Sequence, residues 1–260
     1  MQRNAPIAVM DSGVGGISVL RELVRRMPQE DFLYFGDSAN APYGEKTADD
    51  VRALTLENAA RLFADGAKAL VVACNTATGA AINALRERFP DRVVIGIEPA
   101  LKPAAHSKTS PSVLVMATPL TLKQEKFEHL LAQYNRDARI LTLPCHGLVE
   151  LIERGLTDTT ETAALLADLF APLKNEHLDA VVLGCTHYPL ARAAIQRTVG
   201  ENVPLFDGGE GTARETERRL AAAGLLRENN RAGEVTFQNS ANDPALLALC
   251  HRLLFEEVAR

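Results

Sequence analysis

The sequence has no long apolar run, no basic stretch and no closely spaced cysteines, and each absence narrows the function. No apolar run reaches the roughly 20 residues of a membrane-spanning helix, and the N-terminal MQRNAPIAVMDSG lacks the apolar centre of a secretory signal. The net charge of -5 offers no basic stripe for nucleic-acid phosphates. We therefore expect a cytoplasmic globular protein that binds neither nucleic acid nor a membrane.

The four cysteines stand far apart and form no Cys-x-x-C motif: Cys74, Cys145, Cys185 and Cys250. A reducing compartment would keep such cysteines as thiols. His146 and His187 each lie within two residues of a cysteine, but neither pair supplies the ligands of a tetrahedral zinc site. We therefore expect free thiols and no metal.

Short apolar runs alternate along the chain with segments of helical periodicity. The runs expected to form strands are 7–10, 32–35, 69–74, 93–97, 113–117, 140–143, 180–185 and 203–206. Between them, apolar residues recur at three- and four-residue spacing, as in 17–27, 50–66 and 160–173. This alternation predicts an α/β fold with doubly wound parallel sheets.

The alternation occurs twice, which indicates an internal repeat. Cys185 follows Cys74 by 111 residues (185 minus 74), and the offset between the strand runs VMDS and VMAT is similar. We expect two pseudo-symmetric domains with the active site in the cleft between them.

The segment after residue 207 has no counterpart within the repeat. It contains an expected helix near 212–223, a strand at 234–239 and a last helix from Asp243 to about Val258. We expect it to complete the first domain. The predicted domains are residues 1–98 with 208–260, and residues 99–207.

Two of the expected strands end in a cysteine followed by residues that begin helices well. Asn75 and Thr76 follow Cys74, and Thr186 follows Cys185. Ligands of parallel sheets bind beyond the carboxyl ends of the strands. We expect each thiol at the start of a helix, whose free amides lower its pKa from about 8.5 towards neutrality. Two buried structural thiols are the alternative, and the matching of the motifs disfavours it.

The turn DSGVGGIS, residues 11–18, has three alternative uses. With Asp37 following, it is similar to a dinucleotide motif, but Ser18 stands where that motif has its third glycine. Its backbone amides can instead hold a carboxylate, or the segment is a simple tight turn. Asp11, which lies where phosphates would bind, argues against the nucleotide.

Further candidates lie near these motifs. His187 is either a proton partner of the nearby Cys185 thiol or an isolated histidine. Glu153 can orient a thiol or a substrate ammonium, or be a solvated helix carboxylate. The loop NAPYGEK, residues 40–46, follows the second strand at the edge where ligands bind.

A pair of facing thiols suits one kind of reaction. Inversion of a stereocentre next to a carboxylate needs a base on one face of the carbon and an acid on the other. A thiolate and a thiol fill these roles and exchange protonation states at each turnover. The scheme requires no cofactor, and the repeated motifs contain no lysine that suggests a Schiff base.

The motifs DSGVGG, NAPYG, CNTAT and GCTHYPL together resemble those of the glutamate racemases, within the aspartate/glutamate racemase superfamily. The resemblance spans Ile7 to about Asp207, and GCTH stands where aspartate racemases have GCTE. It implies an isomerase with two α/β domains, no pyridoxal phosphate, and glutamate as its small-molecule substrate. It also implies that the product D-glutamate supplies peptidoglycan, and so cell-wall biogenesis and cell shape. A homodimer stays open.

The resemblance also implies site residues. Cys74 would act on D-glutamate and Cys185 on L-glutamate. Asp11 would assist near Cys74, His187 near Cys185, and Glu153 would support the site. The implied substrate contacts are Asp11, Ser12, Tyr43, Gly44, Asn75, Thr76, Thr118, Thr186 and His187.

Two departures from the family pattern leave the implied catalytic residues untouched. DGGEGTARET, residues 207–216, matches loosely, and His146 stands where a proline is expected. The alternative functions are a racemase of another acidic amino acid or a hydantoin, a related decarboxylase, and a two-lobed binding module without catalysis. The GCTH motif argues against the other superfamily enzymes, and the paired thiols argue against a mere binding module.

Overall fold

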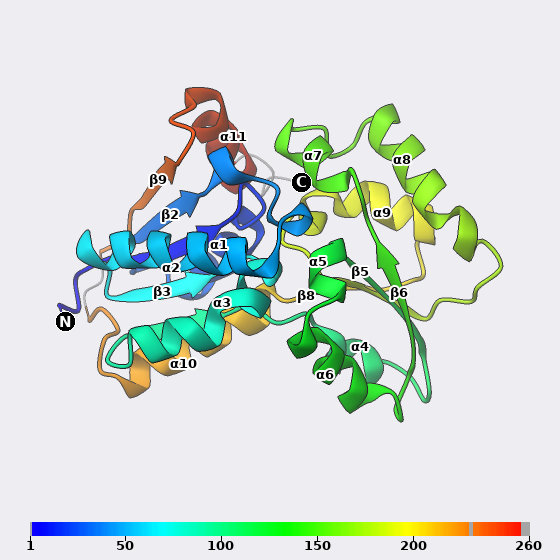
Figure 1. The fold of residues 1–260 in the computed structure, drawn as a ribbon, viewed down its shortest axis with the longest axis horizontal. Helices are drawn as coiled ribbons and strands as arrows, with labels where there is room; N and C mark the ends of the chain where they lie inside the picture. The colour runs from blue at the N-terminus through cyan, green and yellow to red at the C-terminus, as the bar shows by residue number, and fades with distance from the viewer. Residues whose placement is uncertain (1, 229–230, 256–260) are drawn as a thin grey trace.

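The computed structural model describes residues 2–228 and 231–255, which form two α/β lobes side by side (Figure 1). The first lobe, blue to cyan and orange to red, contains a five-stranded sheet in the order β4-β3-β1-β2-β9. The second, green to yellow, contains a four-stranded sheet in the order β6-β5-β7-β8. The strands are β1 (Ile7–Asp11), β2 (Phe32–Gly36), β3 (Ala69–Val72), β4 (Val93–Gly96), β5 (Ser112–Ala117), β6 (Arg139–Pro144), β7 (Ala180–Leu183), β8 (Leu205–Asp207) and β9 (Val235–Asn239).

The two sheets share one strand order, because β4-β3-β1-β2 corresponds to β8-β7-β5-β6. All paired strands run parallel. Each predicted strand run overlaps an observed strand. The prediction of two pseudo-symmetric α/β halves is therefore confirmed.

Helices cover both faces of each sheet, because successive residues of a buried strand point to opposite sides. In β1, Ile7 and Val9 belong to one apolar core and Ala8 and Met10 to another. The helices of the first lobe are α1 (Ile17–Arg26), α2 (Ala48–Ala64), α3 (Asn75–Arg88), α10 (Gly209–Ala222) and α11 (Pro244–Phe255), with the 3-10 turns η1 (Ser38–Asn40) and η2 (Tyr43–Glu45). Those of the second are α4 (Leu101–Ala105), α5 (Pro119–Leu122), α6 (Glu125–Tyr134), α7 (Leu148–Glu153), α8 (Thr160–Phe170) and α9 (Arg192–Val199), with η3 (Ala171–Leu173) and η4 (Tyr188–Ala191).

After β8 the chain returns to the first lobe. The strand β9 pairs with β2 (Figure 1), and α10 and α11 pack against α1. The division into residues 1–98 with 208–260 and 99–207 stays a prediction. The predicted end of the last helix, near Val258, lies outside the described residues. Within the part of the chain that the structure describes, none of the helices combines the length and apolar character that a membrane crossing needs.

Candidate active site

Both predicted thiols line one small cavity between the lobes. Its walls come from the ends of strands and the loops that follow them: Ser12, Pro42, Tyr43, Gly44, Glu45, Cys74 and Thr76 of the first lobe, and Thr118, Pro119, Cys145, Val149, Glu150, Cys185 and His187 of the second. The cavity measures about 20 Å³. That is room for a single water and too little for an amino acid. The structure therefore describes a closed site, which must open to admit a larger ligand.

Cys74 lies just beyond β3, at the N-cap of α3. The backbone N–H of Ala77 donates to its Sγ at 3.4 Å, and the Sγ lies 3.8 Å from the hydroxyl of Ser12. The predicted helix start at Cys74 is thus confirmed. The predicted lowering of its pKa is wrong, because burial, reinforced by the negative charge of Asp11, raises the pKa of Cys74 to about 12. In the closed site Cys74 is therefore a protonated thiol.

Cys185 occupies a different local structure, and the prediction that a helix begins directly after it is wrong. The backbone N–H of Tyr188 donates to the Cys185 carbonyl at 3.1 Å, the short turn η4 follows, and α9 begins only at Arg192. The partner of Cys185 is instead a side chain, because its Sγ lies 3.7 Å from His187 Nδ1.

His187 connects the second thiol to a carboxylate. Its Nε2 lies 2.5 Å from Glu153 Oε1, and both side chains are largely buried. Burial alone would lower the pKa of His187, but its contacts with Cys185 and Glu153 outweigh burial and hold that pKa well above its usual value. The imidazole therefore lies between the Cys185 thiol and the Glu153 carboxylate, within reach of a proton exchanged with either. The structure thus supports the interpretation of His187 as a proton partner.

The glycine-rich turn after β1 holds a carboxylate that belongs to the chain itself. The backbone N–H of Val14 donates to Glu153 Oε1 at 2.7 Å. A side chain at Gly13 would lie 1.8 Å from the same oxygen, and one at Gly15 would lie 2.3 Å from His187 Nδ1. The glycines therefore let two side chains of the second lobe approach the backbone of the first. Glu153 is neither solvated nor in direct hydrogen-bond contact with a thiol: it orients His187.

Asp11 lies fully buried behind the cavity. Its carboxylate accepts hydrogen bonds from the N–H of Gly13 at 3.0 Å and from the hydroxyl of Thr186 at 2.9 Å. Burial raises the pKa of Asp11, and the charge of His187 and these hydrogen bonds oppose the rise. Both Asp11 and Thr186 thus support the cavity from behind and do not line it.

We predict that Asp11→Asn makes Cys74 more reactive. The carboxylate of Asp11 raises the pKa of Cys74, so its removal lowers that pKa and increases the thiolate fraction at any pH below it. Alkylation of Cys74 by iodoacetamide, followed by peptide mass spectrometry, should accelerate up to about tenfold for one pKa unit. Asp158→Asn, at an exposed carboxylate paired with Arg197, is the control. A rate that is unchanged or slower in Asp11→Asn contradicts the electrostatic coupling.

Tyr43 and Gly44 line the cavity, but the Tyr43 hydroxyl points elsewhere. It donates to Asp37 Oδ2 at 2.5 Å, and the amides of Asn40 and Asn58 donate to the same carboxylate. Asp37 is therefore not free to bind a ribose: it holds the Tyr43 loop in place. The sequence did not reveal this role, because Asn58 reaches Asp37 only in the folded lobe.

Threonine hydroxyls form the polar wall of the cavity. Thr76 and Thr118, from opposite lobes, lie 3.0 Å apart, and each lies 2.9 Å from the hydroxyl of Thr121. Hydroxyls and backbone donors suit a ligand that carries carboxylates. Thr121 was absent from the predicted site, although it lies one helical turn after Thr118.

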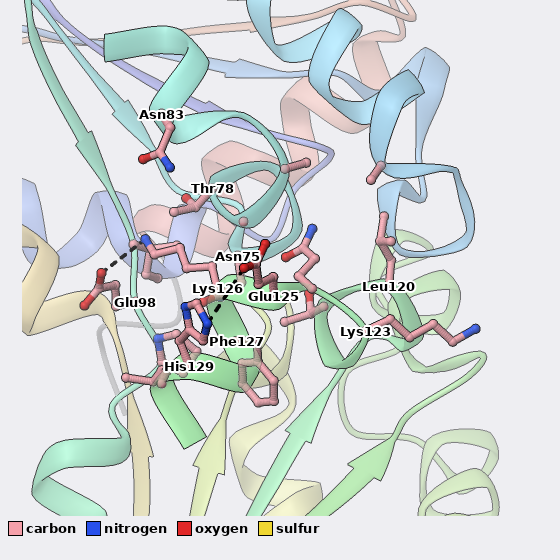
Figure 2. A pocket seen from close by; sticks show the side chains of 18 of the residues that line it. Asn75, Thr78, Asn83, Glu98, Leu120, Lys123, Glu125, Lys126, Phe127 and His129 are labelled. Carbon is pink, nitrogen blue, oxygen red and sulfur yellow. Dashed lines mark ion pairs between the residues drawn. The ribbon is translucent and has the colours of Figure 1, made fainter. Parts of the chain in front are cut away.

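Asn75, like Asp11 and Thr186, is a predicted substrate contact that does not line the thiol cavity. Its side chain lines a larger hollow of about 840 Å³ between α3 and α6, and its Oδ1 is buried without a hydrogen-bond partner (Figure 2). On the wall of this hollow Lys126 pairs with Glu98 at 3.1 Å (Figure 2). None of the cysteines lines it. We therefore place the candidate chemistry in the smaller cavity.

Two lobes of matching topology, each with a cysteine at a strand end facing one shared cavity, define a two-lobed α/β enzyme with its site between the lobes. The chain belongs to the Asp/Glu/Hydantoin racemase family, whose sequence profile matches residues 7–216. It is therefore a racemase, an enzyme of the isomerase class.

Similar proteins extend along nearly the whole chain. The glutamate racemase of Clostridium acetobutylicum is 47% identical over 97% of this chain and 98% of its own length. Escherichia coli glutamate racemase, solved with L-glutamate and the activator UDP-MurNAc-Ala, is 32% identical, with a TM-score of 0.85 over 97% of this chain and 96% of its own. The Francisella tularensis glutamate racemase, solved with D-glutamate, is 26% identical, with a TM-score of 0.83 over 97% and 94%. The predicted resemblance is confirmed.

Proposed function

We propose that this protein interconverts L-glutamate and D-glutamate by proton transfer between two cysteines and the α-carbon. One observation carries the proposal: Cys74 and Cys185, from opposite lobes, line the same cavity. Relatives that are named glutamate racemases, two of them solved with L-glutamate and with D-glutamate, support the substrate.

The electrostatic interaction between Cys74 and Cys185 suits a mechanism in which one cysteine is a thiolate while the other is a thiol. A negative charge on Cys185 contributes to the raised pKa of Cys74, so ionisation of one thiol disfavours ionisation of the other. With L-glutamate, the Cys185 thiolate removes the α-proton and Cys74 donates its proton to the opposite face. With D-glutamate the roles are reversed, and no cofactor takes part.

In this scheme, other side chains bind the substrate and orient the groups that react with it. Removal of the α-proton places negative charge on the α-carboxylate, and the hydroxyls of Ser12, Thr76 and Thr118 line the cavity where they can donate to a carboxylate. His187, held by Glu153, lies beside Cys185 and exchanges protons with its thiol. Asp11 and Thr186 support the cavity wall from behind, and Asn75 would contact substrate only if its side chain turned inward. We further propose that the D-glutamate formed in the cytoplasm supplies peptidoglycan, and a homodimer stays a prediction.

Solvent deuterium tests the two-base scheme. The proton removed from the substrate stays on one thiol, while the incoming proton comes from the other, which has exchanged with solvent. In deuterium oxide, the product should therefore carry α-deuterium from the first turnovers, while the remaining substrate stays largely protiated. Chiral chromatography with mass spectrometry measures both.

The same assay separates the alternatives. Product that retains its α-hydrogen indicates a single base and contradicts the proposal. Inversion of aspartate in preference to glutamate would overturn the substrate assignment while leaving the thiols in place. Binding of glutamate without inversion of either enantiomer would make the protein a two-lobed binding module.

A further inference from the structure

The second lobe reaches across to the first turn of α3 through Gln124. This residue occupies the N-cap of α6, yet its side chain makes no hydrogen bond to that helix. Its Nε2 instead donates to the backbone carbonyl of Thr76 in the first lobe at 2.9 Å. Gln124 is buried, so this contact between lobes is shielded from water.

A glycine inside α3 makes room for this contact. Glycine in a helix interior weakens the helix relative to alanine, so Gly79 requires a reason. A side-chain carbon at Gly79 would lie 1.7 Å from Gln124 Oε1, which is impossible without displacement of the glutamine. Gly79 thus makes α3 less stable than alanine would, but it leaves room for the Gln124 side chain.

The contact lies directly behind the proposed thiol cavity. Thr76 lines the cavity and follows Cys74 by two residues, at the start of the same helix. The hydroxyl of Thr121, in the second lobe, is hydrogen-bonded to the Thr76 hydroxyl, and the Gln124 amide donates to the Thr76 carbonyl. Thr121 and Gln124 themselves line the outer hollow of Figure 2. Residues of the second lobe therefore contact the first turn of α3 on the side away from the thiol cavity.

We propose that Gln124 is a positioning residue: it latches the second lobe onto α3 and sets the closed position of Thr76 at the substrate. In this proposal the latch opens to admit the substrate and re-forms around it, because the closed cavity is too small for an amino acid. Its closure therefore contributes to binding, while the thiols carry out the proton transfer. The kinetic part of this inference rests on the proposed glutamate racemisation.

The first test replaces Gln124 by alanine. Loss of one buried hydrogen bond that forms on closure should raise KM for both glutamate enantiomers about five- to tenfold, with kcat little changed. Gln196→Ala is the matched control, because Gln196 Nε2 also donates to backbone carbonyls, at 2.8 Å, but within the second lobe. It should leave KM unchanged. Equal effects of the two variants on KM would overturn the latch.

A double-mutant cycle with Gly79→Ala gives a signature that general destabilisation does not produce. The methyl group displaces Gln124, so Gly79→Ala alone should raise KM as Gln124→Ala does. With Gln124→Ala already present, the methyl group meets no obstacle, and Gly79→Ala should add no further rise in KM and should raise Tm. Additive effects on KM contradict the proposal.

Hydrogen exchange tests the latch without turnover. Gln124→Ala should increase the exchange rate of the amides in the first turn of α3, whereas Gln196→Ala should not. Unchanged exchange in Gln124→Ala overturns the latch even if glutamate is racemised. If the wild-type protein does not racemise glutamate, the proposed function fails and this measurement still decides whether the latch exists.

Discussion

Replacement of either Cys74 or Cys185 by alanine is expected to lower the rate of glutamate inversion by about 10²- to 10⁴-fold, the effect typical of a positioned acid or base. The reason is geometric, since each lobe supplies one thiol to the shared cavity, and in the two-base scheme each thiol serves one face of the α-carbon. The double variant should lose little more than either single one, because the two thiols act as a unit. Circular dichroism of the glutamate solution follows inversion in both directions.

The single variants should also reveal which thiol serves which enantiomer. The remaining thiol still faces one side of the α-carbon and can exchange that hydrogen without inversion. In deuterium oxide, Cys185→Ala should therefore wash deuterium into D-glutamate only, and Cys74→Ala into L-glutamate only. Cys250→Ala is the control, because Cys250 is buried but does not line the cavity. Near-normal inversion by Cys74→Ala or Cys185→Ala would show that the cysteines are buried structural residues and not the acid and base of the reaction.

His187→Asn is expected to give the second-largest loss. Without the imidazole 3.7 Å from its Sγ, Cys185 loses the group that can take up and return its proton, so removal of the α-proton of L-glutamate should slow. We expect kcat with L-glutamate to fall about 10- to 100-fold, because the Cys185 thiol itself remains, and kcat with D-glutamate to fall less. The equilibrium constant between enantiomers is one, so kcat/KM must fall equally in both directions. Initial rates from each enantiomer over a range of concentrations measure all four constants.

Two further variants separate the role of His187 from a structural one. Glu153→Gln removes the carboxylate that raises the pKa of His187, so the imidazolium should be lost at lower pH and the alkaline limb of the pH–rate profile should move in that direction. His177→Asn, at an exposed histidine, is the control and should change neither kcat nor the pH–rate profile. Equal losses of kcat from both enantiomers in His187→Asn, with an unchanged pH profile, would make this histidine a general structural residue.

The strands and the thiol positions could be predicted because they depend on local patterns. A buried parallel strand is a short apolar run, and Cys74 and Cys185 each end one. The repeat then placed both cysteines at matching edges of two sheets, and the shared strand order follows from it. The family motifs lie in the same loops, which is why the candidate site could be assembled before any coordinates.

The surroundings of the thiols could not be predicted in the same way. The start of α3 at Cys74 indicated a lowered pKa, but desolvation depends on the surrounding lobes, and it outweighs the single amide of Ala77. At Cys185 the local sequence indicated a helix start, but the folded chain forms a turn closed by the N–H of Tyr188 and then the 3-10 helix η4.

By itself, therefore, the sequence determined which groups this protein has for chemistry and at which edge of each sheet they lie. Only the tertiary structure decided what each group touches. Glu153 reaches Val14 across the lobes, Asn58 binds Asp37, and Gln124 lies over α3, all between segments that pack together only after folding. The periodicity of apolar residues indicates which face of a helix or strand is buried. Hydrogen bonds between the lobes depend instead on how the two completed sheets pack.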